Sequence, residues 1–101
     1  MKKIPNIHPG EILREEFLIP FKLSAYRLAQ ETKIPPTRIS QILKKRRSIT
    51  ADTALRFSRF FGTTPDFWLG LQMEYDLREE MSVKSREIDT IKPIEHHTAQ
   101  Q

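Results

Sequence analysis

The segment from residue 24 to residue 47, SAYRLAQETKIPPTRISQILKKRR, constrains the fold more than any other part of the chain. Ser24 at its start is a typical helix N-cap residue. The prolines at 35–36 end this helix and favour a new one, because proline suits the first turn of a helix but not its interior. The apolar residues that follow have the i, i+3, i+4 spacing of an amphipathic helix: Ile39, Ile42 and Leu43. The segment therefore predicts two short helices joined by a tight turn.

Residues typical of helix starts and ends delimit three further helices. Pro9 begins the first of them, Thr50 or Ser48 is expected to cap the second and Thr64 the third, and Gly62 separates the last two. Their expected ranges are residues 9–19, 51–61 and 65–81. No segment alternates with the period of a β-strand over a useful length. The sequence therefore predicts an all-α domain of five helices over residues 1–81, with a polar tail at 82–101 that is flexible or ordered by a partner.

Size and composition restrict the class of protein. A chain of 101 residues forms one domain with a modest core. It has no cysteine, which excludes disulfides and thiolate metal sites. The N-terminus lacks the apolar stretch of a signal peptide, and no run is long enough to span a membrane. We expect a cytoplasmic protein with no membrane contact, no small-molecule ligand and no cofactor.

Charge is distributed unevenly along the chain. Residues 33–59 carry eight lysines and arginines against one acid, Asp52, whereas residues 60–101 carry four basic and eight acidic residues. A polyanion is therefore expected to meet the middle third, and the acidic third is free to contact another protein. The alternative is that both are ordinary solvated surfaces.

The exposed face of the helix after residues 35–36 carries the side chains that suit nucleic-acid recognition. Arginine can fork to guanine, glutamine can pair with adenine, and this helix pair is the size that places its second helix in the DNA major groove. The expected base-contacting residues are Thr37, Arg38, Gln41 and Lys44. The expected phosphate-contacting residues are Ser24, Lys45, Arg46 and Arg47.

The helix pair resembles the Xre/Cro-type helix-turn-helix family, whose fold is lambda-repressor-like. Ala29 is small where the two helices cross closely, and the positions that must share a core are apolar: Leu28, Ile34, Ile39 and Ile42. One position departs from the pattern, because Lys33 stands where this family usually has glycine. A left-handed backbone at a lysine costs about 1 kcal/mol.

Two further stretches narrow the resemblance. Residues 52–77, DTALRFSRFFGTTPDFWLGLQMEYDL, and the HPGEIL sequence at 8–13 resemble HigA-type antitoxins, a family also called virulence-associated protein I. The resemblance implies a type II toxin–antitoxin module. The chain would bind and neutralise a RelE-like, mRNA-cleaving toxin of the HigB kind, and a homodimer would bind double-stranded operator DNA to repress its own operon. The alternative is a stand-alone Xre/Cro-type repressor without a toxin.

The last predicted helix offers a surface for dimerisation. Trp68, Leu71, Gln72 and Tyr75 fall near one stripe of it. A small domain can hide one apolar stripe in its core, so we expect these four residues to form a two-fold interface. The alternative is that the aromatic residues belong to the core.

No catalytic or metal-binding constellation stands out. His96 and His97 are adjacent rather than four apart and lie in the tail, and His8 is isolated. The acidic residues of the second half are explained as helix caps and solvated charges, and no glycine-rich phosphate loop occurs. We therefore predict that the chain is not an enzyme and has no catalytic or metal site.

Overall fold

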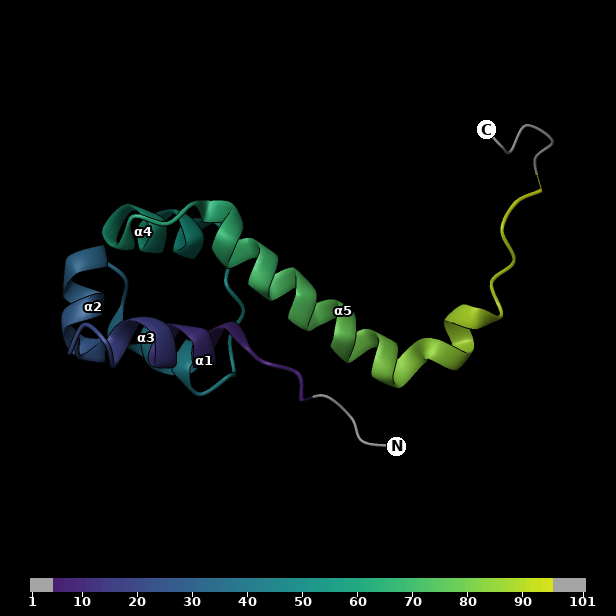
Figure 1. Cartoon of the computed structure of the whole chain (residues 1–101), viewed down its shortest axis with the longest axis horizontal. Coiled ribbons are helices and arrows are strands. Elements are labelled where there is room, and N and C mark those ends of the chain that lie inside the picture. Colours follow the sequence, from purple (N-terminus) through teal and green to yellow (C-terminus); the bar gives the residue numbers. More distant parts are fainter. Residues whose placement is uncertain (1–4, 96–101) are drawn as a thin grey trace.

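The computed structural model describes residues 5–95 and contains five helices and no strand within that range. The first helix consists of α1 (Pro9–Ile12) and a π-helical continuation, η1 (Leu13–Leu18). The others are α2 (Ala25–Thr32), α3 (Pro36–Leu43), α4 (Ala51–Phe61) and α5 (Pro65–Asp89) (Figure 1). The prediction of an all-α, five-helix fold is confirmed. No helix of this part of the chain is both long and apolar enough to cross a membrane.

Three helices begin where a hydroxyl side chain caps them. The side-chain oxygens of Ser24, Thr50 and Thr64 accept hydrogen bonds from the backbone N–H groups of Arg27, Thr53 and Phe67. Each bond satisfies one of the N–H groups that a helix start leaves unpaired. The predicted caps at Ser24 and Thr64 are confirmed.

A lysine in the left-handed conformation follows the end of three helices. Lys22, Lys33 and Lys45 have φ angles of 52°, 58° and 64°. At each end the next residue donates its N–H to a carbonyl five positions back, as Ile34 does to Ala29. This is the Schellman arrangement, which usually employs glycine. The left-handed turn expected at Lys33 is therefore present, and the cationic side chains lie at the negative ends of their helices.

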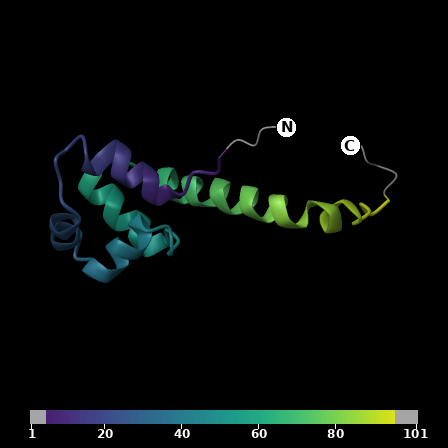
Figure 2. The same cartoon turned by 90° about the horizontal axis from the view of Figure 1, so that it is seen from below.

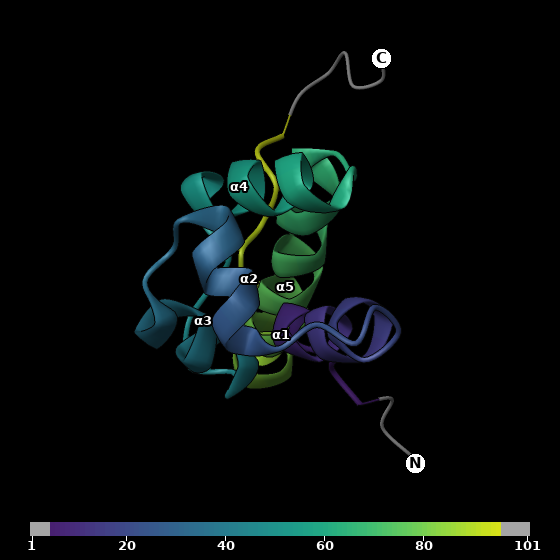
Figure 3. The same ribbon diagram turned by 90° about the vertical axis from the view of Figure 1, so that its left-hand side faces the viewer.

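The core lies between the first four helices and the beginning of α5. Its aliphatic members come mainly from the first helix, α2 and α3, and its aromatic centre is formed by Phe57 and Trp68. The fully or almost fully buried apolar residues are Leu13, Leu18, Leu28, Ala29, Ile34, Ile39, Ile42, Ile49, Ala54, Phe57 and Trp68. Figure 3 shows the short helices gathered around the start of α5.

Two residues predicted at a dimer interface lie inside the monomer instead. Trp68 is 0% exposed, and its Nε1 donates to the Thr63 hydroxyl at 2.8 Å. The buried Gln72 accepts a hydrogen bond from the Ile49 N–H at 2.7 Å and donates to Asp76 at 3.0 Å. Neither side chain has surface to offer a partner, so both assignments to the interface are wrong. The alternative, that the aromatic side chain belongs to the core, is correct for Trp68.

Helix α5 extends eight residues beyond its predicted end at Met81. Residues 82–89 contain neither glycine nor proline, and Lys84 pairs with Glu80 at 3.2 Å one turn earlier, so nothing local stops the helix. The radius of gyration is 17.7 Å, whereas a compact chain of this length has about 13 Å. Figures 1 and 2 show why: most of α5 projects away from the short helices that are gathered at its N-terminal end. His96 and His97 lie outside the described residues.

Candidate nucleic-acid interface

Helices α2 and α3 form the predicted helix-turn-helix pair. Leu28 and Ala29 of α2 are buried against Ile39 and Ile42 of α3, and Ile34 fills the turn between them. The four positions that were expected to share a core therefore do so, and the small Ala29 is buried with them. Burying this side of α3 leaves its opposite side in solvent.

Of the four predicted base-contacting residues, two lie on the exposed side of α3 and a third directly follows its last residue. Thr37, Gln41 and Lys44 are exposed. The side-chain oxygen of Gln41 accepts a hydrogen bond from Nη1 of Arg47 at 2.8 Å. The structure thus brings one predicted base reader together with one predicted phosphate contact.

The fourth, Arg38, is held by residues of α4. Its Nη1 lies 2.7 Å from Oδ2 of Asp52 and donates to the Thr53 hydroxyl at 3.3 Å. The other oxygen of Asp52, Oδ1, lies 3.0 Å from Nε of Arg56. The hydrogen bond from Arg38, and to a lesser extent the one from Arg56, lowers the pKa of Asp52. This carboxylate therefore stays ionised at neutral pH.

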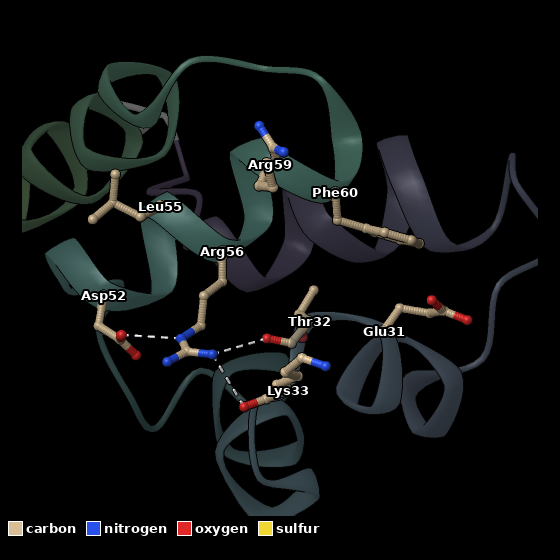
Figure 4. Close-up of a pocket in the computed structure, with 8 residues that line it drawn as sticks. All are labelled: Glu31, Thr32, Lys33, Asp52, Leu55, Arg56, Arg59 and Phe60. Carbon is tan, nitrogen blue, oxygen red and sulfur yellow. Dashed lines mark hydrogen bonds and ion pairs between the residues drawn. The ribbon is translucent and has the colours of Figure 1, made fainter.

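Arg56 connects this carboxylate to the turn of the motif. Its Nη1 donates to the carbonyl oxygens of Thr32 at 3.1 Å and Lys33 at 3.3 Å, at the end of α2 (Figure 4). These carbonyls have no partner within the helix, so the guanidinium supplies one. Sequence reasoning missed Arg56, although its position four residues after Asp52 was a signal for an ion pair.

A basic loop, residues 44–48, follows α3. Nζ of Lys45 lies 3.0 Å from Oε2 of Glu11 in α1, whereas Arg46 is exposed. The bond between Gln72 and the Ile49 N–H fastens the end of this loop to α5. Ser24 is exposed at the start of α2, and its hydroxyl already accepts the Arg27 N–H at 3.0 Å. Among the predicted phosphate-contacting residues, Arg46 is therefore the most available to a phosphate.

His8 has a structural position at the start of α1. Its Nδ1 accepts the N–H of Gly10 at 2.9 Å, and its ring packs edge-on against Tyr75. Burial lowers the pKa of His8 and keeps the imidazole neutral, as an accepting Nδ1 requires. In the described range, no group of three histidine, aspartate or glutamate side chains is arranged to hold a metal ion.

Comparison with known proteins places this geometry in a family. Residues 13–68 match a family model described as helix-turn-helix. Virulence-associated protein I of Dichelobacter nodosus is 53% identical over 76 residues, covering 75% of this chain and 70% of that protein. A solved addiction-module antidote protein of the HigA family from Coxiella burnetii is 48% identical with a TM-score of 0.85, over 90% of this chain and 100% of that one. The chain belongs to the HigA family of helix-turn-helix proteins.

A second HigA structure shows the family with DNA. The antitoxin HigA of Pseudomonas aeruginosa, solved with the higBA promoter, is 39% identical to this chain and has a TM-score of 0.85. The match covers 90% of this chain and 100% of the relative's chain. The resemblance found in the sequence is therefore confirmed, because one HigA relative is named an addiction-module antidote protein and the other an antitoxin.

Proposed function

We propose that this HigA-family chain is the antitoxin of a HigBA-like module, a dimeric repressor of its own operon that also neutralises a RelE-like toxin. The exposed face of α3 carries the proposal, because Thr37 and Gln41 lie in solvent beside the basic loop, which begins with the exposed Lys44. The Pseudomonas aeruginosa relative, solved with the higBA promoter, supports DNA binding by this fold. Base-edge contacts would give sequence preference, and the loop would neutralise phosphates.

DNA binding is tested by two substitutions with opposite signatures. Gln41→Ala should cost about 1–3 kcal/mol on the DNA upstream of the chain's own gene and little on a random duplex, because glutamine reads a base edge. Arg46→Ala should weaken binding to both duplexes and flatten the salt dependence by about one unit, because one phosphate contact is lost. Binding titrations over a salt series measure both quantities. If Gln41→Ala loses the same affinity for both duplexes, Gln41 does not read a base edge.

Toxin binding rests on the family and on the charge of the second half. The acidic residues of 60–101 outnumber the basic ones by eight to four, which suits a basic, RNA-cleaving partner. Co-expression with the neighbouring reading frame should yield a complex that co-purifies through size-exclusion chromatography. Specific operator binding without such a complex would instead favour the stand-alone repressor.

A different surface of α5 from the predicted one supports dimerisation. Leu71 is half-buried and, with Ile7 and Ile12, lines a hollow of about 230 Å³. Tyr75 is half-buried with its ring against His8, so both residues face the N-terminal segment of their own chain. Four exposed apolar residues lie on the opposite side of the helix at spacings close to whole turns: Met73, Leu77, Met81 and Ile88. A second copy of the chain would cover this stripe and place two α3 helices about 34 Å apart, one turn of DNA.

Leu77→Glu should convert the dimer to a monomer. Leu77 is 58% exposed in the middle of the stripe, so a charge there prevents apolar pairing but leaves the monomer core intact. Light scattering should give the mass of one chain, and operator affinity should fall by more than about tenfold, because one half-site is lost. Val83→Glu is the matched control, because Val83 is exposed but lies off the stripe. A Leu77→Glu variant that stays dimeric would contradict the proposed interface.

A further inference from the structure

Asp52 is the single acidic residue among residues 33–59, in the part of the chain proposed to meet DNA. A negative charge there repels phosphates and costs affinity for any nucleic acid. It is 51% exposed as a side chain, yet both of its oxygens are engaged, Oδ2 by Arg38 and Oδ1 by Arg56. An exposed ion pair contributes little to stability, and a carboxylate in the first turn of α4 adds only about 0.3–1 kcal/mol through the helix dipole, so stability alone is a weak reason for this carboxylate.

The contacts fix one edge of Arg38. The hydrogen bonds described for its guanidinium run through Nη1, to Asp52 and to Thr53. The side chain is 24% exposed, whereas that of Lys45 in the basic loop is 53% exposed. A guanidinium has five donors in a rigid plane, so anchoring Nη1 leaves Nη2 and Nε in a fixed orientation at the start of α3.

We propose that Asp52 is a specificity-determining residue that positions Arg38 for base reading and keeps it from pairing with phosphates. The inference rests on the DNA binding proposed above. A free arginine pairs with the phosphates of any sequence, whereas an anchored one gains a contact only where a base edge lies in register. The anchor also removes part of the ordering cost of Arg38 on the correct operator. Discrimination between sequences therefore rises although the average attraction to DNA falls.

Arg56 provides an internal comparison. It shares the carboxylate with Arg38 but directs Nη1 to the carbonyls of Thr32 and Lys33 (Figure 4). Arg56→Gln therefore removes support for the turn and leaves the Arg38–Asp52 contact in place. It separates an effect on the helix-turn-helix backbone from an effect on Arg38.

The test is Asp52→Asn, titrated against the duplex upstream of the chain's own gene and a random duplex of equal length and composition. We expect affinity for the upstream duplex to fall by about tenfold and affinity for the random duplex to rise by about threefold. The salt dependence on the random duplex should steepen by about one unit, because the released Arg38 gains a phosphate. A purely structural role for Asp52 would weaken binding to both duplexes and would not steepen the salt dependence.

Three control variants make the result decisive. Asp89→Asn removes the same charge from the exposed end of α5 and should leave discrimination unchanged. In an Arg38→Gln background, Asp52→Asn should no longer lower discrimination, because the two residues act through one contact. Arg56→Gln should keep most of the discrimination. The inference is overturned if Asp52→Asn distinguishes the two duplexes as well as the wild type does. It is also overturned if Asp52→Asn still lowers discrimination in the Arg38→Gln background, or if Arg56→Gln loses as much discrimination as Asp52→Asn. A wild type that does not distinguish the two duplexes would overturn the proposed function itself.

Discussion

Replacing Trp68 by alanine should lower the free energy of unfolding by about 3–5 kcal/mol, the usual cost of emptying an aromatic core site. Trp68 is completely buried, and its ring centroid lies 5.0 Å from those of Phe17 and Phe57. Its Nε1–H is bonded to Thr63, so the variant also leaves that hydroxyl without its partner. Urea unfolding measures the loss. It is monitored by far-ultraviolet circular dichroism, because the variant lacks the chain's single tryptophan and gives no tryptophan fluorescence.

Two comparisons locate the source of this loss. Trp68→Phe keeps most of the apolar contact and loses the hydrogen bond, so it should cost about 1–3 kcal/mol. If Trp68 belongs to the core, the loss in the alanine variant is independent of protein concentration, because it does not involve association. A small loss of unfolding free energy that grows on dilution would instead indicate that Trp68 lies in the dimer interface.

The boundaries of most helices could be predicted because they depend on neighbouring residues. Ser24 and Thr64 cap the helices that follow them, and Pro9 and Pro65 occupy first helical positions. Gly62 ends α4 with a left-handed backbone, as expected. In each case one side chain, or its absence, decides the local backbone.

The ends of other helices could not be predicted from such signals. Lysine is not a residue that marks a left-handed position, yet Lys22 and Lys45 end their helices in the same way as Lys33. At Lys33, the two bonds that Arg56 donates to the carbonyls of Thr32 and Lys33 come from α4, 24 and 23 residues later, and are tertiary information. The end of α5 was placed too early, because scarce apolar residues indicate lack of burial rather than loss of helix.

The candidate site shows the same division. The i, i+3, i+4 pattern of Ile39, Ile42 and Leu43 was sufficient to identify the exposed face of α3. It did not indicate that Arg38 is bound to Asp52, fourteen residues later, or that Lys45 is paired with Glu11. On α5, the sequence did not distinguish core residues from interface residues, and only packing shows that Trp68 and Gln72 face inward while Leu77 faces solvent.

Gly10→Ala should lower the free energy of unfolding by about 3 kcal/mol, the upper end of the usual cost of overpacking. A β-carbon at Gly10 would overlap the backbone carbonyl oxygen of Ile42, at the end of α3. It would also lie 3.2 Å from Nδ1 of His8, which caps the same turn. Backbone cannot rotate out of the way as a side chain can, so α1 and α3 must separate. Thermal or urea unfolding measures the effect.

Gly70→Ala is the matched control, because a β-carbon there meets no atom within 4 Å. It should raise the free energy of unfolding by about 0.5–1 kcal/mol, since alanine loses less backbone entropy than glycine in a helix. Measuring both variants in the Leu77→Glu background removes any contribution from association. The Gly10→Ala variant should also bind the upstream duplex more weakly at temperatures where it is still folded, because the displaced helix is the one proposed to read DNA. Equal effects of the two alanines would show that the close approach of α1 to α3 does not hold the recognition helix in place.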